Sequence, residues 1–365
     1  MITAEFLPAS LLTPMAASLG VTEGMAGQAV TATALVALVT GLLITSATKS
    51  IDRRWVLMFF SVLQIISSLL VAFAPTLHVL LMGRLLLGIA IGGFWAMSTA
   101  TAMRLVPADK VPKALAVIFS SVSIATVVAA PLGSYLGSLI GWRNVFILCI
   151  LPSMLALLWQ LWVLPSMKPE SSGSLSTLFR VLRRPGMIGG MLATILIFSG
   201  HFAFFTYLRP FLETVGQVSV ESISLILLGF GIANFIGTSV AGHLLARNLR
   251  LTLALVPFVM GMLALAMVLF GHLAMVDGLL VAMWGFAFGL VPVGWSTWLA
   301  TTVPDEAESA GGLLVASIQF AISAGAAGGG AVFDLNGASG VFAGSGFLLV
   351  TAMVIVFMGV KVKAE

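Results

Sequence analysis

Charged residues are scarce in this chain. Asp, Glu, Lys and Arg together make up 8% of its 365 residues, whereas 60% are hydrophobic and the mean hydropathy is +1.14. A soluble domain carries about 25% charged residues, because its surface must be hydrated. The shortage therefore excludes an ordinary water-soluble globular protein. Since the apolar residues are spread along nearly the whole length, we predict an all-α polytopic membrane protein and not a soluble domain with one anchor.

Cysteine is nearly absent, and the signatures of catalysis are missing as well. Cys149 is the only cysteine, so an internal disulfide is impossible, and its apolar neighbours favour a small buried hydrophobe. The sequence has no phosphate-binding loop and no Cys/His metal spacing. We therefore expect neither an enzyme nor a nucleic-acid-binding protein, and no cofactor. Apolar residues follow Met1 directly, which predicts that there is no signal peptide.

Apolar runs of about 20 residues, long enough to cross a bilayer as helices, follow one another along the chain. We predict twelve spans, of which the first is short. They lie near residues 1–18, 27–47, 56–74, 79–103, 112–138, 144–164, 187–210, 222–245, 252–270, 277–302, 310–333 and 341–360.

Basic residues are confined almost entirely to alternate breaks between these spans. Of the 17 Lys and Arg, those in the breaks and the C-terminal tail are Lys49, Arg53, Arg54, Arg104, Lys110, Lys113, Lys168, Arg180, Arg183, Arg184, Arg247, Arg250, Lys361 and Lys363. Basic loops stay on the cytoplasmic side of a membrane. The pattern predicts that this face and the C-terminus are cytoplasmic, and it leaves Arg84, Arg143 and Arg209 to be explained.

The sequence repeats itself across its longest polar break. A residue of the same type lies 196 positions later in the chain for each of Ala130, Gly133, Gly141, Val145 and Phe146, and this spacing is here called the shorter interval. The same holds at a spacing of 197, the longer interval, for Gly88, Gly92, Val106, Pro107 and Arg53. Parallel repeats of this kind build many transporters. We predict two related six-helix halves, 1–165 and 187–365, joined by a cytoplasmic loop, 166–186.

The repeat also makes two predictions about the first span. Subtracting the longer interval from Met187 gives a position upstream of Met1, so we expect helix one to begin before this sequence and to be incomplete here. The same interval carries Glu5 to Phe202 and Arg84 to Val281, which would concentrate the intramembrane charge in the first half.

The fifth predicted span is rich in small residues around a proline. Pro131 removes a backbone donor, which is tolerated at membrane depth only where protein covers the helix. Ala130, Gly133 and Gly137 share the span, and such residues let a second helix approach closely. We predict a kinked helix that is packed against protein.

Three motifs resemble those of the major facilitator superfamily, in its twelve-helix drug:proton antiporter branch. Ala130-Pro131-Leu132-Gly133 resembles the antiporter motif of helix five, and the run LLMGRLLLGIAIGGFWAMS resembles helix four through Arg84. Asp52, Arg53 and Arg54 resemble the cytoplasmic loop motif, although its usual glycines are absent. The resemblance extends over the whole chain. Within the branch, the stretches AAPLGS, GWRNVF and LVPVGWSTW resemble exporters of purine ribonucleosides.

Three ionisable residues within the predicted spans are candidates for proton coupling: Glu5, Arg84 and His201. A charge at bilayer depth costs about 2.5 to 3.5 kcal/mol on insertion scales, so Glu5 is a functional candidate, the alternative being a hydrated residue near an interface. Arg84 shares a helical face with small residues and Trp95, which favours a function over snorkelling to the interface. His201 either titrates or is a hydrogen-bonded core residue.

Candidates for substrate binding are aromatic or amide side chains: Trp95, Phe205, Tyr207, Asn234, Trp295 and Gln319. Trp295 lies beside a proline and a glycine and is suited to stacking on a planar ligand. We interpret Trp298 as part of an interfacial aromatic belt. Asn234 and Gln319 either bind a base or ribose or tie helices together.

We therefore expect a monomeric, proton-driven exporter in a bacterial inner membrane, whose partners are a small-molecule substrate, protons and lipid. The resemblance implies purine ribonucleosides such as inosine and guanosine. Export of sugars or drugs and uptake by symport remain alternatives. A scaffold or sensor without flux is disfavoured, because it needs no acid within the membrane.

Overall fold

The computed structural model describes residues 1–365 except 108–110, 169–179, 272, 304–306 and 361–365. Within these residues the chain is a bundle of helices without strands. The helices are α1 (Ile2–Ser10), α2 (Leu12–Leu19), α3 (Glu23–Ala47), α4 (Arg53–Ala72), α5 (Leu77–Leu105), α6 (Val111–Ile140), α7 (Trp142–Leu148), α8 (Ile150–Val163), α10 (Met187–Thr214), α11 (Val220–Arg247), α12 (Leu249–Phe270), α13 (Ala274–Thr302) and α14 (Ala307–Gly359).

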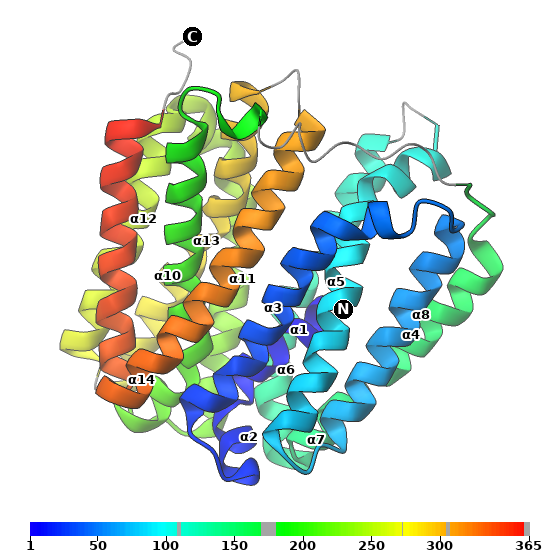
Figure 1. The fold of residues 1–365 in the computed structure, drawn as a ribbon. Helices are drawn as coiled ribbons and strands as arrows, with labels where there is room; N and C mark the ends of the chain where they lie inside the picture. Colours follow the sequence, from blue (N-terminus) through cyan, green and yellow to red (C-terminus); the bar gives the residue numbers. More distant parts are fainter. Residues whose placement is uncertain (108–110, 169–179, 272, 304–306, 361–365) are drawn as a thin grey trace.

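The two sequence halves lie beside each other. In Figure 1 the blue to blue-green helices of residues 1–165, here called the first half, occupy one side, and the helices of residues 187–365, the second half, occupy the other. Helices α3 and α14 pack together where the halves meet, and so do α6 and α11. The short helix α1 lies between them and contacts α3, α6 and α10.

Each of the twelve predicted spans lies on one of these helices or helix pairs. Among the described residues, nine helices are long and apolar enough to cross a membrane, or ten when α1 and α2 are taken as one bent span. Helix α14 covers two predicted spans, and the expected polytopic helical fold is confirmed.

Local sequence sets where several helices begin. Four helices begin at a side chain whose oxygen accepts a hydrogen bond from a backbone N–H of the first turn. These side chains are Thr22 for α3, Asp52 for α4, Ser219 for α11 and Asn248 for α12. Such caps satisfy donors that have no partner within the helix. Glycine sets one break in each half, because Gly141 and Gly337 have φ of 82° and 68°, a region that other residues avoid. The shorter interval relates these two glycines to each other.

The first span is not one helix. Helices α1 and α2 meet at Leu11 with a bend of 71°, whereas the sequence predicted a single short span. Pro8 and Pro14 lie on either side of the break, and each lacks the N–H that would bond the carbonyl four residues earlier. One such proline does not suffice, since α10 continues through Pro210. Helix α6 likewise continues through the buried Pro131.

Helix contacts repeat from one half to the other. Four glycines of α5 and α13 lie so close to the neighbouring helix that a Cβ would meet its backbone. The pairs are Gly88 with Thr33, Gly285 with Phe230, Gly92 with Ala37, and Gly289 with Asn234. The longer interval relates every member of the second-half pairs to its first-half counterpart. Close approach through small residues is the usual contact between membrane helices, and here it occurs at equivalent places.

Two arginines near the starts of α4 and α12 repeat in the same way and correct one predicted correspondence. Arg54 donates to the carbonyl of Leu161 and Arg250 to that of Phe357, both at 2.7 Å. The shorter interval relates the two donors and also the two acceptors. By contact, the counterpart of Arg250 is therefore Arg54, whereas the longer interval had related Arg250 to Arg53.

Trp298 corrects a second prediction. It is completely buried, so it is not part of an aromatic belt that faces lipid. Its ring covers Gly190 of α10, where a Cβ would collide with it, and it packs edge to face on Trp295. Trp298 can be buried because the residue opposite it on α10 is a glycine, and the sequence of α13 alone does not show which residue lies opposite. Cys149 is partly exposed and caps α7, so it is less buried than expected.

Candidate functional site

Helices α1 and α10 occupy equivalent places in the two halves. Two contacts of α1 recur in α10, and every residue involved is shifted by the shorter interval. The contact of Leu7 with Gly133 corresponds to that of Ala203 with Gly329. The contact of Leu11 with Gly137 corresponds to that of Tyr207 with Phe333. The shorter interval, and not the longer one, therefore applies to α1 and α10. Glu5 consequently corresponds to His201, which corrects the predicted correspondence with Phe202.

Phe6 and Phe202 identify the centre of the molecule. They are equivalent residues at this interval, and their rings stack on each other across the two halves, with centroids 6.0 Å apart and planes inclined by 16°. Two equivalent residues touch each other only next to the axis that relates them. In transporters built from parallel repeats, the substrate site lies at this interface. The candidate site is therefore built around the Phe6–Phe202 pair.

The site has an ionisable residue on each side of this pair. Glu5 precedes Phe6 and His201 precedes Phe202, and the two side chains are 5% and 3% exposed. Phe6 is only partly buried, in contrast to the buried run from Leu7 to Ser10 that follows it in α1. The arrangement combines a flat aromatic surface with a buried carboxyl group on a helix between the halves.

Arg84 holds the backbone of α1 at the site. Its guanidinium donates to the carbonyls of Ala4 (2.7 Å), Glu5 (3.0 Å) and Ala29 (2.9 Å). The Ala4 carbonyl has no partner within its helix, because Pro8 lacks an N–H. The structure therefore brings two of the proton-coupling candidates, Arg84 and Glu5, together through the Glu5 backbone carbonyl. Arg84 is completely buried and does not snorkel.

His201 lies within an aromatic cluster of the second half. Its Nδ1 accepts a hydrogen bond from Trp284 Nε1 at 3.0 Å, and its ring stacks on Phe288 with a centroid distance of 3.3 Å. A nitrogen that accepts a hydrogen bond carries no proton, so this geometry belongs to the neutral imidazole with its proton on Nε2. Of the two interpretations left open by the sequence, the contacts favour a hydrogen-bonded core histidine.

Phe205 extends the aromatic surface toward the first half. It contacts Phe6 edge to face at 6.3 Å and also packs on His201 and Phe230. Among the predicted substrate residues, it is the one that the structure places beside the Phe6–Phe202 pair.

Tyr207 and Asn234 bind backbone. The Tyr207 hydroxyl donates to the Ala326 carbonyl at 3.1 Å and fills the space left by Gly27 of the first half. Asn234 Nδ2 donates to the Gly285 carbonyl at 3.3 Å, which ties α11 to α13. Both side chains are thus used in joining helices, as one alternative for Asn234 had predicted.

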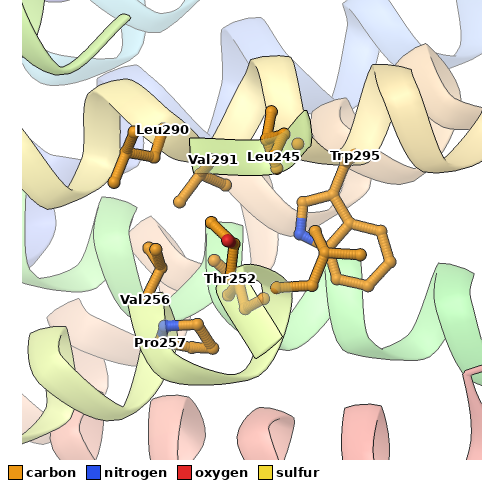
Figure 2. A pocket seen from close by; sticks show the side chains of 10 residues that line it. Leu245, Thr252, Val256, Pro257, Leu290, Val291 and Trp295 are labelled. Carbon is orange, nitrogen blue, oxygen red and sulfur yellow. The ribbon is translucent and has the colours of Figure 1, made fainter. Parts of the chain in front are cut away.

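Trp295 lies elsewhere. It is 1% exposed and borders an apolar pocket between α12 and α13 together with Val291, Thr252 and Pro257 (Figure 2). All residues that line this pocket belong to the second half. Gln319 is buried in α14. Trp95 is half-buried in α5, where it packs on Phe94 and against a small buried cluster that includes Ala4 of α1.

The predicted antiporter motif packs against α1. A Cβ on Gly133 would come within 2.5 Å of Leu7 Cδ2 and 2.7 Å of Ser10 Oγ, and one on Gly137 would collide with Leu11. Ala130 and Pro131 are buried beside them. The small residues thus bring α6 against the broken helix that carries Glu5.

The cytoplasmic loop motif joins α4 to the start of the central loop. Asp52 accepts hydrogen bonds from the Ser166 hydroxyl, from the Met167 N–H and from the Arg54 N–H, the last two at 2.9 Å. The Ser166 hydroxyl and then the Met167 N–H lower the pKa of Asp52 below its usual range. Arg53 donates to Thr48. The motif keeps these contacts without its usual glycines.

Sequence reasoning assigned no role to three residues of this region, Phe6, Arg209 and Glu213. Phe6 resembled any apolar residue of a span, and only its contact with an equivalent residue reveals its position. Arg209 and Glu213 form an ion pair of 2.7 Å within α10, so intramembrane charge is not confined to the first half. Their spacing of four along a helix was a signal that could have found them.

The chain matches a family model described as the Major Facilitator Superfamily over residues 1–326. It is 48% identical over 363 residues to the purine ribonucleoside efflux pump NepI of Escherichia coli O6:H1, covering 100% of this chain and 92% of that protein. It is 49% identical over 356 residues to NepI of Salmonella enteritidis PT4, covering 97% and 90%.

Two solved structures share the fold. A POT family transporter in complex with 5-aminolevulinic acid matches with a TM-score of 0.83 at 11% identity, over 98% of this chain and 92% of that one. A D-xylose-proton symporter matches with a TM-score of 0.76 at 18% identity, over 99% and 94%.

Proposed function

Because the chain belongs to the major facilitator superfamily, we propose that it exports purine ribonucleosides such as inosine and guanosine in exchange for protons. The observation that carries the substrate class is the identity of 48% over the whole chain to pumps named for purine ribonucleosides. No bound cofactor is needed in this proposal, because the proton gradient supplies the energy.

The geometry between the halves suits such a substrate. A purine is a flat ring, and Phe6, Phe202 and Phe205 offer aromatic faces where the halves meet. Stacking of a base on an aromatic side chain contributes about 1–3 kcal/mol. Glu5 is the buried carboxyl group next to this surface. We propose that it takes up a proton from outside and releases it inside as the halves 1–165 and 187–365 rock about the site.

The proposal includes a location and an orientation. The chain is a multi-pass membrane transporter, and we place it in the bacterial inner membrane as a monomer with a cytoplasmic C-terminus. The basic residues on alternate breaks support this orientation. On the same argument, the end of α10 near Thr214 faces outward, since α10 begins directly after the cytoplasmic central loop.

The test measures release of inosine and guanosine from cells that produce the protein. A protonophore should abolish the release. Glu5→Gln keeps the size of the side chain but cannot exchange a proton, so it should end export against a gradient while exchange of nucleoside down its gradient persists. Glu221→Gln is the matched control, because Glu221 is an exposed carboxylate at the start of α11.

Each outcome has a distinct meaning. Release of sugars or drugs without release of nucleosides would overturn the substrate class alone. Concentrative export by Glu5→Gln equal to the parent would transfer the coupling role to another residue. Net nucleoside uptake driven by protons would establish symport instead of export.

A further inference from the structure

A cation of the second half reaches into the break of the first span. Arg209 of α10 donates from Nη1 to the carbonyl of Ser10 at the end of α1. In a regular helix the N–H of residue 14 would bond this carbonyl, but that residue is Pro14, which has no N–H. A carbonyl left unpaired at membrane depth is costly. Arg209, from the other half, therefore supplies the hydrogen-bond donor that Pro14 lacks.

Glu213 keeps Arg209 in this orientation. Its Oε1 accepts from Arg209 Nε at 2.7 Å, and the side chains of Glu213 and Arg209 are 20% and 6% exposed. A guanidinium holds its donors in a fixed planar fork, so fixing Nε also directs the terminal nitrogens. With Nε bound to Glu213, Nη1 points at Ser10. The contact is therefore built from three parts: a proline-freed carbonyl, an arginine from the opposite half and a carboxylate that orients it.

We propose that Arg209 is a positioning residue that holds the outer end of the two halves closed by capping the Ser10 carbonyl, and that this cap must break for the protein to open outward. The contact joins α10 to the α1–α2 break, so the halves cannot separate at this end while it persists. A second contact lies between the halves, where Thr22 at the start of α3 donates to Asp334 Oδ2 at 3.2 Å. The proposal rests on the proposed orientation, which makes this end the outer one, and on the proposed exporter function for its transport readout.

Cross-linking measures the closed state directly. In a Cys149→Ser background, which removes the natural thiol, Thr22→Cys and Asp334→Cys place a cysteine on each half at the second contact. Oxidation should join them when the outer end is closed, whether or not substrate is present. Adding Arg209→Gln should lower the cross-linking rate severalfold. Arg209→Lys keeps the charge but loses the fork, and it should give an intermediate rate.

Two further variants separate this role from a general loss of stability. Pro14→Ala returns an N–H to the Ser10 carbonyl, which then competes with Arg209, so cross-linking should slow although Arg209 is intact. Arg143→Gln is the matched control. Arg143 also binds a backbone carbonyl, that of Ala74, and the Ser18 hydroxyl, but both partners lie in the first half. Its removal should leave cross-linking unchanged.

Transport provides the third readout. Loss of the cap should reduce the maximal rate of nucleoside export more than it changes the half-saturating concentration, because the substrate surface at Phe6 is untouched. An unchanged cross-linking rate in both Arg209→Gln and Pro14→Ala would overturn the proposal. An equal decrease in Arg143→Gln would overturn it too. Absence of nucleoside export by the parent would refute the proposed substrate while leaving the cross-linking result valid.

Discussion

Two buried arginines show how single residues make charge tolerable inside this bundle. Arg84 binds the Ala4 carbonyl and Arg209 binds the Ser10 carbonyl, and in both cases a proline four residues later has removed the usual donor. A hydrogen bond with a charged partner contributes about 1.5–3 kcal/mol, more than one between neutral groups. Each arginine thus satisfies a carbonyl that would otherwise be unpaired, and the carbonyls in turn hydrogen-bond the buried cation.

Phe6 allows a prediction about substrate affinity. Phe6→Leu retains an apolar side chain but removes the aromatic face on which a base would stack. Since stacking contributes about 1–3 kcal/mol per base, the half-saturating nucleoside concentration should rise about fivefold or more. Transport rates at a series of inosine concentrations, measured in membrane vesicles, give this value.

The matched control for Phe6 is Phe59, which is 52% exposed on α4. Phe59→Leu should leave the half-saturating concentration unchanged. An unaltered value in Phe6→Leu, with normal amounts of protein in the membrane, would contradict a stacking role.

At the scale of elements, α6 and the broken first helix behave as one packed unit. Gly133→Leu should block transport and lower the melting temperature, because its Cβ alone would already overlap Leu7 and Ser10. Overpacking of a filled contact costs about 1–3 kcal/mol. Thermal unfolding of the purified protein and export from cells measure the two effects.

Gly229 in α11 is the control for this substitution, since nothing lies within 4 Å of a Cβ built there. Gly229→Leu should be tolerated in both assays. Normal export by Gly133→Leu would mean that the α1–α6 contact is not needed for transport.

The junction between α4 and the central loop predicts a pH dependence. The pKa of Asp52 is lowered in the folded protein, chiefly by the Ser166 hydroxyl. Its contribution to stability is therefore present above the pKa of the unfolded state and is lost as the pH falls through the lower folded pKa. Asp52→Ala should reduce the melting temperature at pH 7, and this difference should shrink at strongly acidic pH.

Ser166→Ala should reproduce part of the effect of Asp52→Ala, because it removes the first cause of the lowered pKa. A difference between parent and Asp52→Ala that is the same at neutral and strongly acidic pH would contradict the role of the ionised carboxylate.

At the scale of the whole molecule, two similar halves meet along α1, α3, α6, α10, α11 and α14. Equivalent contacts recur at the longer interval for α5 and α13 and at the shorter interval for α1 and α10. The two intervals differ by a single position, but this difference decides whether Glu5 corresponds to a phenylalanine or to His201. Contacts determine such a correspondence more reliably than identical letters, because Gly and Ala are abundant in this chain.

Membrane orientation provides the prediction at this scale. A reporter fused after Arg183 should be active in the cytoplasm, and one fused after Gly216 should be active outside, since α10 lies between these positions. Alkaline phosphatase, which is active only outside, and a fluorescent protein that folds only inside are suitable reporters. The reverse result at Arg183 would overturn the orientation and, with it, the outer location of the Arg209 contact.

The sequence by itself determined the features that depend on composition and spacing. Low charge and long apolar runs determine a helical membrane fold, because each span satisfies its own backbone hydrogen bonds. The glycines of α6 and the Asp52 motif were predicted from short, local patterns. Glu5 was found because an acid within an apolar run is rare.

Only the tertiary structure decided the features that depend on which helices face each other. Trp298 is buried because Gly190 lies opposite, and His201 accepts a hydrogen bond because Trp284 reaches it from α13. The position of Phe6 next to the axis that relates the two halves is known only from its contact with Phe202, and no local sequence pattern predicts it. The partner of the Ser10 carbonyl is Arg209, 199 residues away along the chain. Hydrogen bonds and packing contacts depend on which side chains are close in space. Residues far apart in the sequence become close only when the chain folds.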